Sequence, residues 1–175
     1  VAKKILMGSG AVSDADLIEQ SLMFNNPDTP YLHRTPGSAG NQKTWTWSAW
    51  VKRGKITSDA YLWSVYNGST SGTYANIYFT SSDTLAYGIW SPNQRVTNRV
   101  FRDTAAWYHI MVVLDTTQST ANDRIKIYIN GVQETSFSTT NNPDEDSDEP
   151  FNAAQKHVFG DVYALDPGGT ARWFD

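Results

Sequence analysis

The sequence contains no cysteine, so a disulfide scaffold, a thiolate metal site and a cysteine nucleophile are all excluded. Long apolar runs are missing too: none approaches the roughly 20 residues that cross a membrane, so we expect no membrane insertion. The start of the chain, VAKKILMGSG, has two lysines and an apolar stretch too brief for the core of a signal peptide. The fold must therefore be stable without disulfides, and 175 residues are enough for one domain with a well-buried core.

Charged residues are also few, and 14 Lys and Arg against 18 Asp and Glu leave a net charge of −4. Nucleic-acid binding requires a clustered basic surface, whereas the densest basic group here is Lys52, Arg53 and Lys55, which fits a solvated strand end. We therefore expect no nucleic-acid partner. Heptads and internal repeats are absent as well, so nothing in the sequence supports a coiled-coil trimer.

Aromatic residues, in contrast, make up 13% of the chain, a high share that favours β-structure and contacts with glycans. The clearest strands lie within residues 107–132. In the first, residues 107–114, both faces are largely apolar. We expect burial on both sides, with His109 as a hydrogen-bonded core residue and Trp107 in or near the core. In the second, residues 124–129, isoleucines alternate with longer polar or aromatic side chains, which is typical of a half-buried strand.

Asn130-Gly131 follows directly and supplies the two left-handed conformers of a type I′ turn, which predicts a hairpin. Further short segments predict strands at residues 21–24, 31–32, 44–52, 61–66, 73–80, 84–90, 97–101 and 157–163. A helical period is found only at residues 14–20. This pattern predicts an all-β fold, a two-sheet antiparallel β-sandwich.

The segment WYHIMVVLDTTQSTANDRIKIYINGV, residues 107–132, has a tryptophan that opens a strand, a His-aliphatic run that ends at an aspartate, and a second strand that closes on YINGV. It resembles the laminin G-like and pentraxin-like branch of the concanavalin A-like lectin/glucanase superfamily. Residues 21–54 and 100–110 resemble laminin G-like domains of bacteriophage virion proteins, especially tail fibres. The resemblance implies a jelly roll, which we assign to residues 17–175, and we expect residues 1–16 to form an N-terminal arm.

The end of the chain departs from that pattern. Related phage domains continue beyond the position of Asp175 into a closing strand, and a jelly roll without that strand has an open sheet edge. We therefore expect either that the chain is part of a longer polypeptide or that a partner supplies the strand.

A candidate binding face lies on the predicted hairpin of residues 73–90. If Thr80 pairs with Thr84, the outward face carries three rings and one amide beside two small residues. The candidates are Tyr74, Asn76, Tyr78 and Trp90, with Tyr74 opposite Trp90, Asn76 opposite Gly88 and Tyr78 opposite Ala86. Sugars stack on such rings and hydrogen-bond to amides, so this trough predicts carbohydrate binding. The alternatives are ordinary cross-strand pairs or a face covered by another subunit, and Trp45 and Trp47 are expected in the core.

Five carboxylates are concentrated in residues 144–149. Asp144, Asp146 and Asp148 could supply oxygen ligands for calcium, and laminin G-like and pentraxin-like domains often bind calcium in loops at one end of the sandwich. The alternative is an exposed acidic loop whose charges stay solvated. The absence of a glycine that would fold the loop around an ion favours this alternative.

The same segment bears on catalysis. Laminarinase-type glucanases of the superfamily place glutamate, aspartate and glutamate at alternate positions of a strand that faces the cleft. Here Ser147 occupies the central position between Glu145 and Glu149, and no apolar residues interleave to make a strand. The three histidines show no triad or zinc-site pattern. We therefore expect neither enzymatic activity nor a cofactor other than calcium.

Two functions from different classes remain. The first is a non-catalytic, lectin-like domain of a bacteriophage virion protein, a tail fibre or surface appendage, that binds host-surface glycans. The second is a purely structural virion protein that packs against copies of itself or against capsid or tail neighbours. A glycoside hydrolase is a distant third. The phage context, with assembly in the host cytoplasm and exposure on the particle, rests on the resemblance alone.

Overall fold

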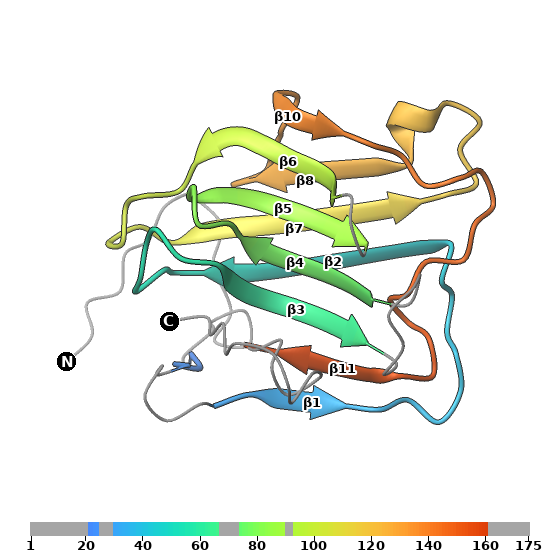
Figure 1. Cartoon of the computed structure of the whole chain (residues 1–175), viewed down its shortest axis with the longest axis horizontal. Coiled ribbons are helices and arrows are strands. Elements are labelled where there is room, and N and C mark those ends of the chain that lie inside the picture. Colours follow the sequence, from blue (N-terminus) through green and yellow to red (C-terminus); the bar gives the residue numbers. More distant parts are fainter. Residues whose placement is uncertain (1–20, 25–29, 67–73, 90–92, 161–175) are drawn as a thin grey trace, which may run out of the picture.

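The computed structural model describes residues 21–24, 30–66, 74–89 and 93–160, which form two antiparallel sheets packed face to face (Figure 1). The larger sheet has the order β1-β11-β3-β4-β5-β6-β10 and the smaller one β2-β7-β8-β9. The elements are β1 (Leu32–Arg34), β2 (Thr44–Val51), β3 (Ala60–Tyr66), β4 (Tyr74–Phe79), β5 (Thr84–Ile89), β6 (Asn93–Val100), β7 (Tyr108–Asp115), the short η3 (Ala121–Asp123), β8 (Ile125–Ile129), β9 (Val132–Gln133), β10 (Phe137–Thr140) and β11 (Lys156–Phe159). The prediction of an all-β, two-sheet antiparallel sandwich is confirmed.

Several predictions fall on residues that the structure does not describe. The N-terminal arm, the helical period at residues 14–20 and the end of the chain after residue 160 lie outside the described residues. Residues 21–24 are described but form no strand, contrary to the prediction. Within the described ranges, no helix has the length and apolar character required to cross a membrane.

Both predicted turns are present. The Thr80 amide donates a hydrogen bond of 2.8 Å to the Thr84 carbonyl, which closes the β4–β5 hairpin. Asn130 and Gly131 have φ angles of 53° and 80°, as a type I′ turn between β8 and β9 requires. These local signals could be read from the sequence because each depends on only two to four residues.

Aromatic side chains fill the space between the sheets. The Trp63 ring, from β3, stacks on Phe151 with the ring centroids 3.9 Å apart, and it lies parallel to Trp47 of the facing sheet. Trp45 meets both Trp63 and Phe151 edge to face. The predicted core positions of Trp45 and Trp47 are confirmed, since both side chains are buried.

The expectation that β7 is buried on both faces is wrong. Its inward residues Ile110, Val112 and Leu114 are buried, but the outward residues are only partly so. Among the described residues, no strand or helix is packed over the outer face of the smaller sheet. Apolar side chains such as Met111 and Val113 therefore occupy a half-exposed surface.

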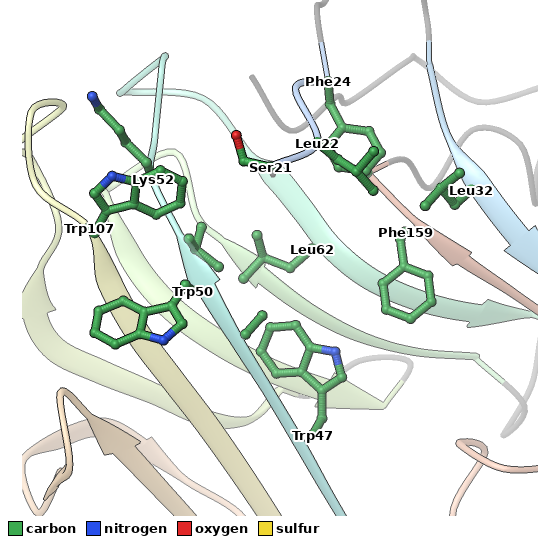
Figure 2. A pocket seen from close by; sticks show the side chains of 13 residues that line it. Ser21, Leu22, Phe24, Leu32, Trp47, Trp50, Lys52, Leu62, Trp107 and Phe159 are labelled. Atoms are coloured by element: carbon green, nitrogen blue, oxygen red, sulfur yellow. The ribbon is translucent and has the colours of Figure 1, made fainter. Parts of the chain in front are cut away.

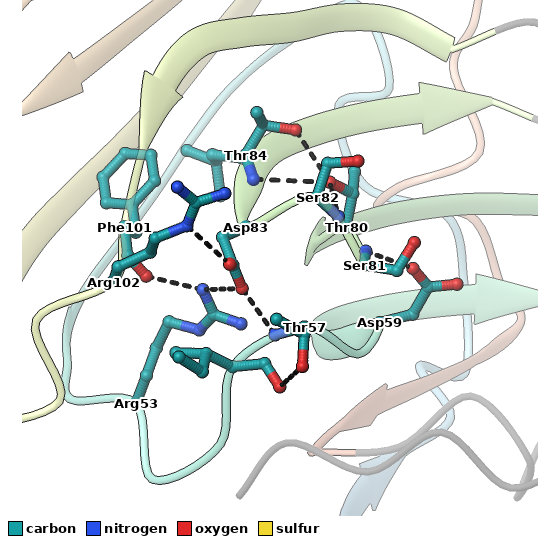
Figure 3. A network of polar contacts seen from close by, with 12 residues as sticks. Arg53, Thr57, Asp59, Thr80, Ser81, Ser82, Asp83, Thr84, Phe101 and Arg102 are labelled. Atoms are coloured by element: carbon teal, nitrogen blue, oxygen red, sulfur yellow. Dashed lines mark hydrogen bonds and ion pairs between the residues drawn. The ribbon is translucent and has the colours of Figure 1, made fainter.

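A buried ion pair connects the two sheets at one end (Figure 3). Asp83, in the β4–β5 turn, lies 3.1 Å from Arg53, which follows β2, and both side chains are almost fully buried. Asp83 also accepts hydrogen bonds from the Thr57 amide and from Arg102. Burial opposes the charged carboxylate, but these donors and the Arg53 charge together hold the pKa of Asp83 below its ordinary value.

A second buried carboxylate lies at the other end of the core. Glu149 is 5% exposed, and its Oε2 has no hydrogen-bond partner among the described residues. Burial raises the pKa of Glu149 to about 7, and the charges of Asp144 and Asp148 act in the same direction. A hydrogen bond from the Ser147 hydroxyl to Oε1 opposes this rise.

Replacing Asp83 by asparagine should lower the free energy of unfolding by about 3–5 kcal/mol at pH 7, because Arg53 would remain buried without its counter-charge. Because folding lowers the pKa of Asp83, its contribution is present above the ordinary value of 3.8 and is lost as the pH falls through the lower folded value. Urea denaturation at pH 7 and in acid measures both effects. Exposed Asp148→Asn is the control and should change stability by less than about 0.5 kcal/mol. If the Asp83→Asn chain were as stable as the parent at pH 7, the ion pair with Arg53 would not stabilise the fold.

Glu149→Gln should stabilise the fold by about 3 kcal/mol at pH 8 and leave it nearly unchanged at pH 4. The folded pKa of about 7 lies above the ordinary 4.5, so ionisation of Glu149 opposes folding. That cost begins above pH 4.5 and is complete above pH 7. Urea denaturation at the two pH values measures it, with the exposed Glu145→Gln as the matched control. An equal gain at both pH values would show that charge is not the cause.

Candidate functional site

The predicted trough on β4 and β5 has the expected register but not the expected exposure. Asn76 pairs with Gly88 and Tyr78 with Ala86, while Trp90 lies outside the described residues. Asn76 is only 5% exposed and Ala86 is fully buried, so the middle of the face is closed to a ligand.

The tyrosines of this face are half-buried rather than open. Tyr78 stacks on Tyr61 of β3, with centroids 4.8 Å apart and planes within 7°, and Tyr74 pairs in register with Tyr66. Tyr61 and Tyr78 thus form an ordinary cross-strand aromatic pair, which was one of the alternatives considered for this face.

The acidic segment shows no arrangement that fits calcium. Asp144, Asp146 and Asp148 are all exposed, and Asp146 forms an ion pair with Lys43 at 3.7 Å. Within the described ranges, no group of three or more acidic, histidine or cysteine side chains lies close enough to hold a metal ion. Calcium binding here stays a prediction, and the geometry favours the solvated loop.

The two glutamates considered for catalysis lie in different environments. Glu145 is exposed and contacts Arg124 at 3.2 Å, whereas Glu149 is buried against the core. His157 is also buried, and its Nε2 accepts a hydrogen bond from the Asn152 amide, consistent with a neutral ring. Burial lowers the pKa of His157, which keeps the ring in that state. These side chains have structural partners rather than a common cleft.

Exposed aromatic rings gather instead at one end of the smaller sheet. Trp50 is 56% exposed and Trp107 is 48% exposed. Trp50 pairs with His109 across β2 and β7, and their ring centroids lie 5.1 Å apart. Lys52 lies two residues after Trp50 and Trp107 lies two residues before His109, so both continue the same outward face. Figure 2 shows them beside each other. We call these four side chains, Trp50, Lys52, Trp107 and His109, the indole platform.

The predictions for Trp107 and His109 were therefore wrong. Both were expected in the core because their strand has apolar residues on both faces, but the face that carries them is the half-exposed outer one. The sequence did contain a signal for the platform. Trp50 follows Thr44, Thr46 and Ser48 on the polar face of β2, so an outward tryptophan could have been inferred there.

A pocket of about 960 Å³ lies next to the platform, between the two sheets (Figure 2). Its walls are apolar side chains from both sheets, among them Trp47 of β2, Leu62 of β3, Phe159 of β11 and Leu32 of β1. Trp50, Lys52 and Trp107 lie at its margin, and among the described residues that line it Lys52 alone is charged. The site thus combines exposed rings, one cation and an apolar hollow.

Solved structures of low sequence identity share this fold. The native heptameric SAP-like pentraxin from Limulus polyphemus has a TM-score of 0.53 and 17% identity over 83% of this chain, which spans 65% of the pentraxin. The Ruminococcus gnavus IT-sialidase CBM40, bound to α2,3-sialyllactose, has a TM-score of 0.54 and 14% identity over 76% of this chain and 70% of that one.

Comparison by sequence gives a consistent result. None of the curated protein sequences is significantly similar to this chain. Residues 28–165 match the sequence model of the Laminin_G_3 family, and they make up well over half of the chain. The chain belongs to this family of the concanavalin A-like lectin/glucanases superfamily.

Proposed function

We propose that the chain is a non-catalytic, glycan-binding domain and that the indole platform is its ligand surface. The observation that carries this proposal is the exposure of two neighbouring indole rings, Trp50 and Trp107, in a protein whose other tryptophans with a described side-chain environment are buried. An indole face stacks on the apolar CH face of a sugar ring, and the cation of Lys52 and the imidazole of His109 supply polar contacts beside it.

The family and one structural neighbour add support. The neighbour is a carbohydrate-binding module that was solved with a bound sialylated sugar, although its low identity to this chain extends only to the fold. Exposed aromatic clusters also mark interfaces between proteins, so the platform by itself fits the second candidate function, a structural packing surface. The two functions differ in whether the free chain binds sugars.

The biological setting we propose is the surface of a bacteriophage particle. It is supported by the likeness of residues 21–54 and 100–110 to laminin G-like domains of virion proteins. In that setting the domain would engage host glycans, while other parts of the assembled particle position it. Mass spectrometry of purified particles tests this setting, and absence of the chain from them would contradict it.

The purified chain should bind a subset of bacterial glycans and lipopolysaccharides on an array. Trp107→Ala should weaken that binding by about tenfold, equivalent to roughly 1.4 kcal/mol, because a stacking surface is lost. Val132→Ala is the matched control, since Val132 is an exposed apolar residue of the same sheet, and it should bind like the parent. Tyr78→Ala tests the predicted trough and should also leave binding unchanged.

The array is read with calcium and with chelator. Binding that disappears with chelator would move the site to the acidic segment and contradict the platform as the sole ligand surface. A blank array from a folded chain, together with failed particle assembly by Trp107→Ala, would favour the structural function. Loss of binding in Tyr78→Ala alone would favour the trough.

A further inference from the structure

One segment, residues 141–155, connects β10 to β11 and runs along one end of the sandwich (Figure 1). It contains no strand, so single hydrogen bonds rather than a β-ladder attach its backbone to the rest of the fold. The Asp146 amide donates to the Thr116 carbonyl, and the Glu149 amide donates to the Gln42 carbonyl. Isolated contacts break at a lower cost than a ladder, so this segment can open while the sheets stay paired.

The backbone of this segment has two conformations that oppose closure. Asp146 and Asn152, on either side of Glu149, have φ angles of 59° and 66°. Residues other than glycine adopt this left-handed region at some cost, although Asp and Asn tolerate it best. The Phe151 ring acts against release, because it is fully buried and its centroid lies 3.9 Å from that of Trp63. The closed segment therefore depends on one aromatic anchor.

Next to this anchor the segment inserts a carboxyl group into the core. The Glu149 side chain is almost fully buried, and its Oε2 has no hydrogen-bond partner among the described residues. Within the segment it faces the carboxylates of Asp144 and Asp148 and the hydroxyl of Ser147. From β5 it faces the buried hydroxyl of Tyr87, on which its charge also acts. An ionised Glu149 would therefore be a buried anion in surroundings that do not neutralise it.

The basic groups around the segment have other partners. Lys43 and Arg124 form ion pairs with exposed carboxylates of the segment, at 3.7 and 3.2 Å. Arg95 of β6 donates to the Asn141 carbonyl. His157 of β11 accepts a hydrogen bond from a segment amide, and burial lowers its pKa, so the ring is neutral near pH 7. Among the described residues, no cation is paired with the buried glutamate.

We propose that residues 141–155 form a pH-controlled latch, which is closed while the Glu149 carboxyl is protonated and is driven towards opening when that carboxyl ionises. Opening transfers the carboxylate to water and uncovers the Trp63 ring. The latch lies at the opposite end of the core from the buried pair of Arg53 and Asp83, so it is separate from the indole platform. Closure of this end of the sandwich then responds to the acidity of the surroundings.

The direction of the pH effect follows from the two states of Glu149. In the closed state burial raises its pKa to about 7, whereas in the open, solvated state the ordinary value of 4.5 applies. Ionisation therefore leaves opening unchanged below pH 4.5, makes it about tenfold more frequent per pH unit up to pH 7, and adds nothing further above pH 7. Protonation of His157 acts oppositely, because its lowered pKa favours opening as the pH falls below 6.5.

Hydrogen exchange of the full chain, followed by NMR from pH 5 to pH 8 and corrected for intrinsic rates, tests the latch. The reporters are the amides of Asp146 and Asn152, which donate to groups outside the segment. Their exchange in the parent, relative to Glu149→Gln, should rise from about fourfold faster at pH 5 to about 300-fold faster at pH 8. Both chains carry His157, so its contribution cancels in this ratio.

Two controls separate the latch from other effects. Glu145→Gln neutralises an exposed carboxylate of the same segment, and its ratio to the parent should not change with pH. Amides of the β7–β8 ladder report global unfolding, and they should be far better protected than the two reporters. Low urea should speed exchange of the ladder amides only, because local opening exposes little surface. Glycan binding by Glu149→Gln should equal that of the parent, so failure of the latch and failure of the proposed function are distinguishable.

Two results would overturn the proposal. Reporter amides with the same protection and the same urea dependence as the ladder would mean that the segment opens only when the whole domain unfolds. A ratio between the parent and Glu149→Gln that stays constant from pH 5 to pH 8 would mean that ionisation of this carboxyl does not control the segment.

Discussion

The ion pair between Arg53 and Asp83 is the contact on which the geometry of the functional end depends. Arg53 follows the last residues of β2 in the smaller sheet, and Asp83 lies in a turn of the larger sheet. The Arg53 guanidinium also donates to the Phe101 carbonyl and lies 4.5 Å from the centre of the Phe79 ring. Desolvation of two charges is costly, and here hydrogen bonds and an aromatic face offset part of that cost. The pair thereby fixes where β2 ends.

The indole platform begins at that fixed end. Lys52 directly precedes the buried Arg53, so one side chain of this dipeptide is anchored in the core while its neighbour points to solvent. Trp50 is carried by β2 and is paired with His109 of β7, whereas Trp107 directly precedes β7. The platform is therefore anchored by the pairing of β2 with β7, and Lys52 and Trp107 extend it by one residue beyond each strand.

The unequal width of the two sheets gives this domain two different surfaces in one region. The outer face of the smaller sheet is half-exposed and carries the platform, whereas the inner face of the larger sheet extends past its partner layer and forms the pocket wall. Fold alone would not place either surface, because sandwiches of this superfamily host many functions. Both assignments follow from which side chains remain exposed after the sheets have paired.

The sequence by itself determined most of the strands, the two turns and the family. Period-two alternation set the inward residues of β8, Asn130-Gly131 and the Thr80–Thr84 pairing set two hairpins, and the Trp-to-YINGV segment identified the superfamily. These features are local or nearly so, and they follow from backbone geometry and alternation. The register of the predicted trough was correct for the same reason.

Only the tertiary structure decided exposure. Trp107 and Asn76 were assigned to the wrong environments because burial depends on what the second sheet covers, and a strand with two apolar faces does not reveal which face is covered. The raised pKa of Glu149 likewise depends on long-range packing, since its segment reads in sequence as a solvated acidic loop. The pocket beside β2 results from a difference in width between two sheets. The difference in width arises because strands far apart in the chain pair with each other. Local sequence patterns do not encode such pairing.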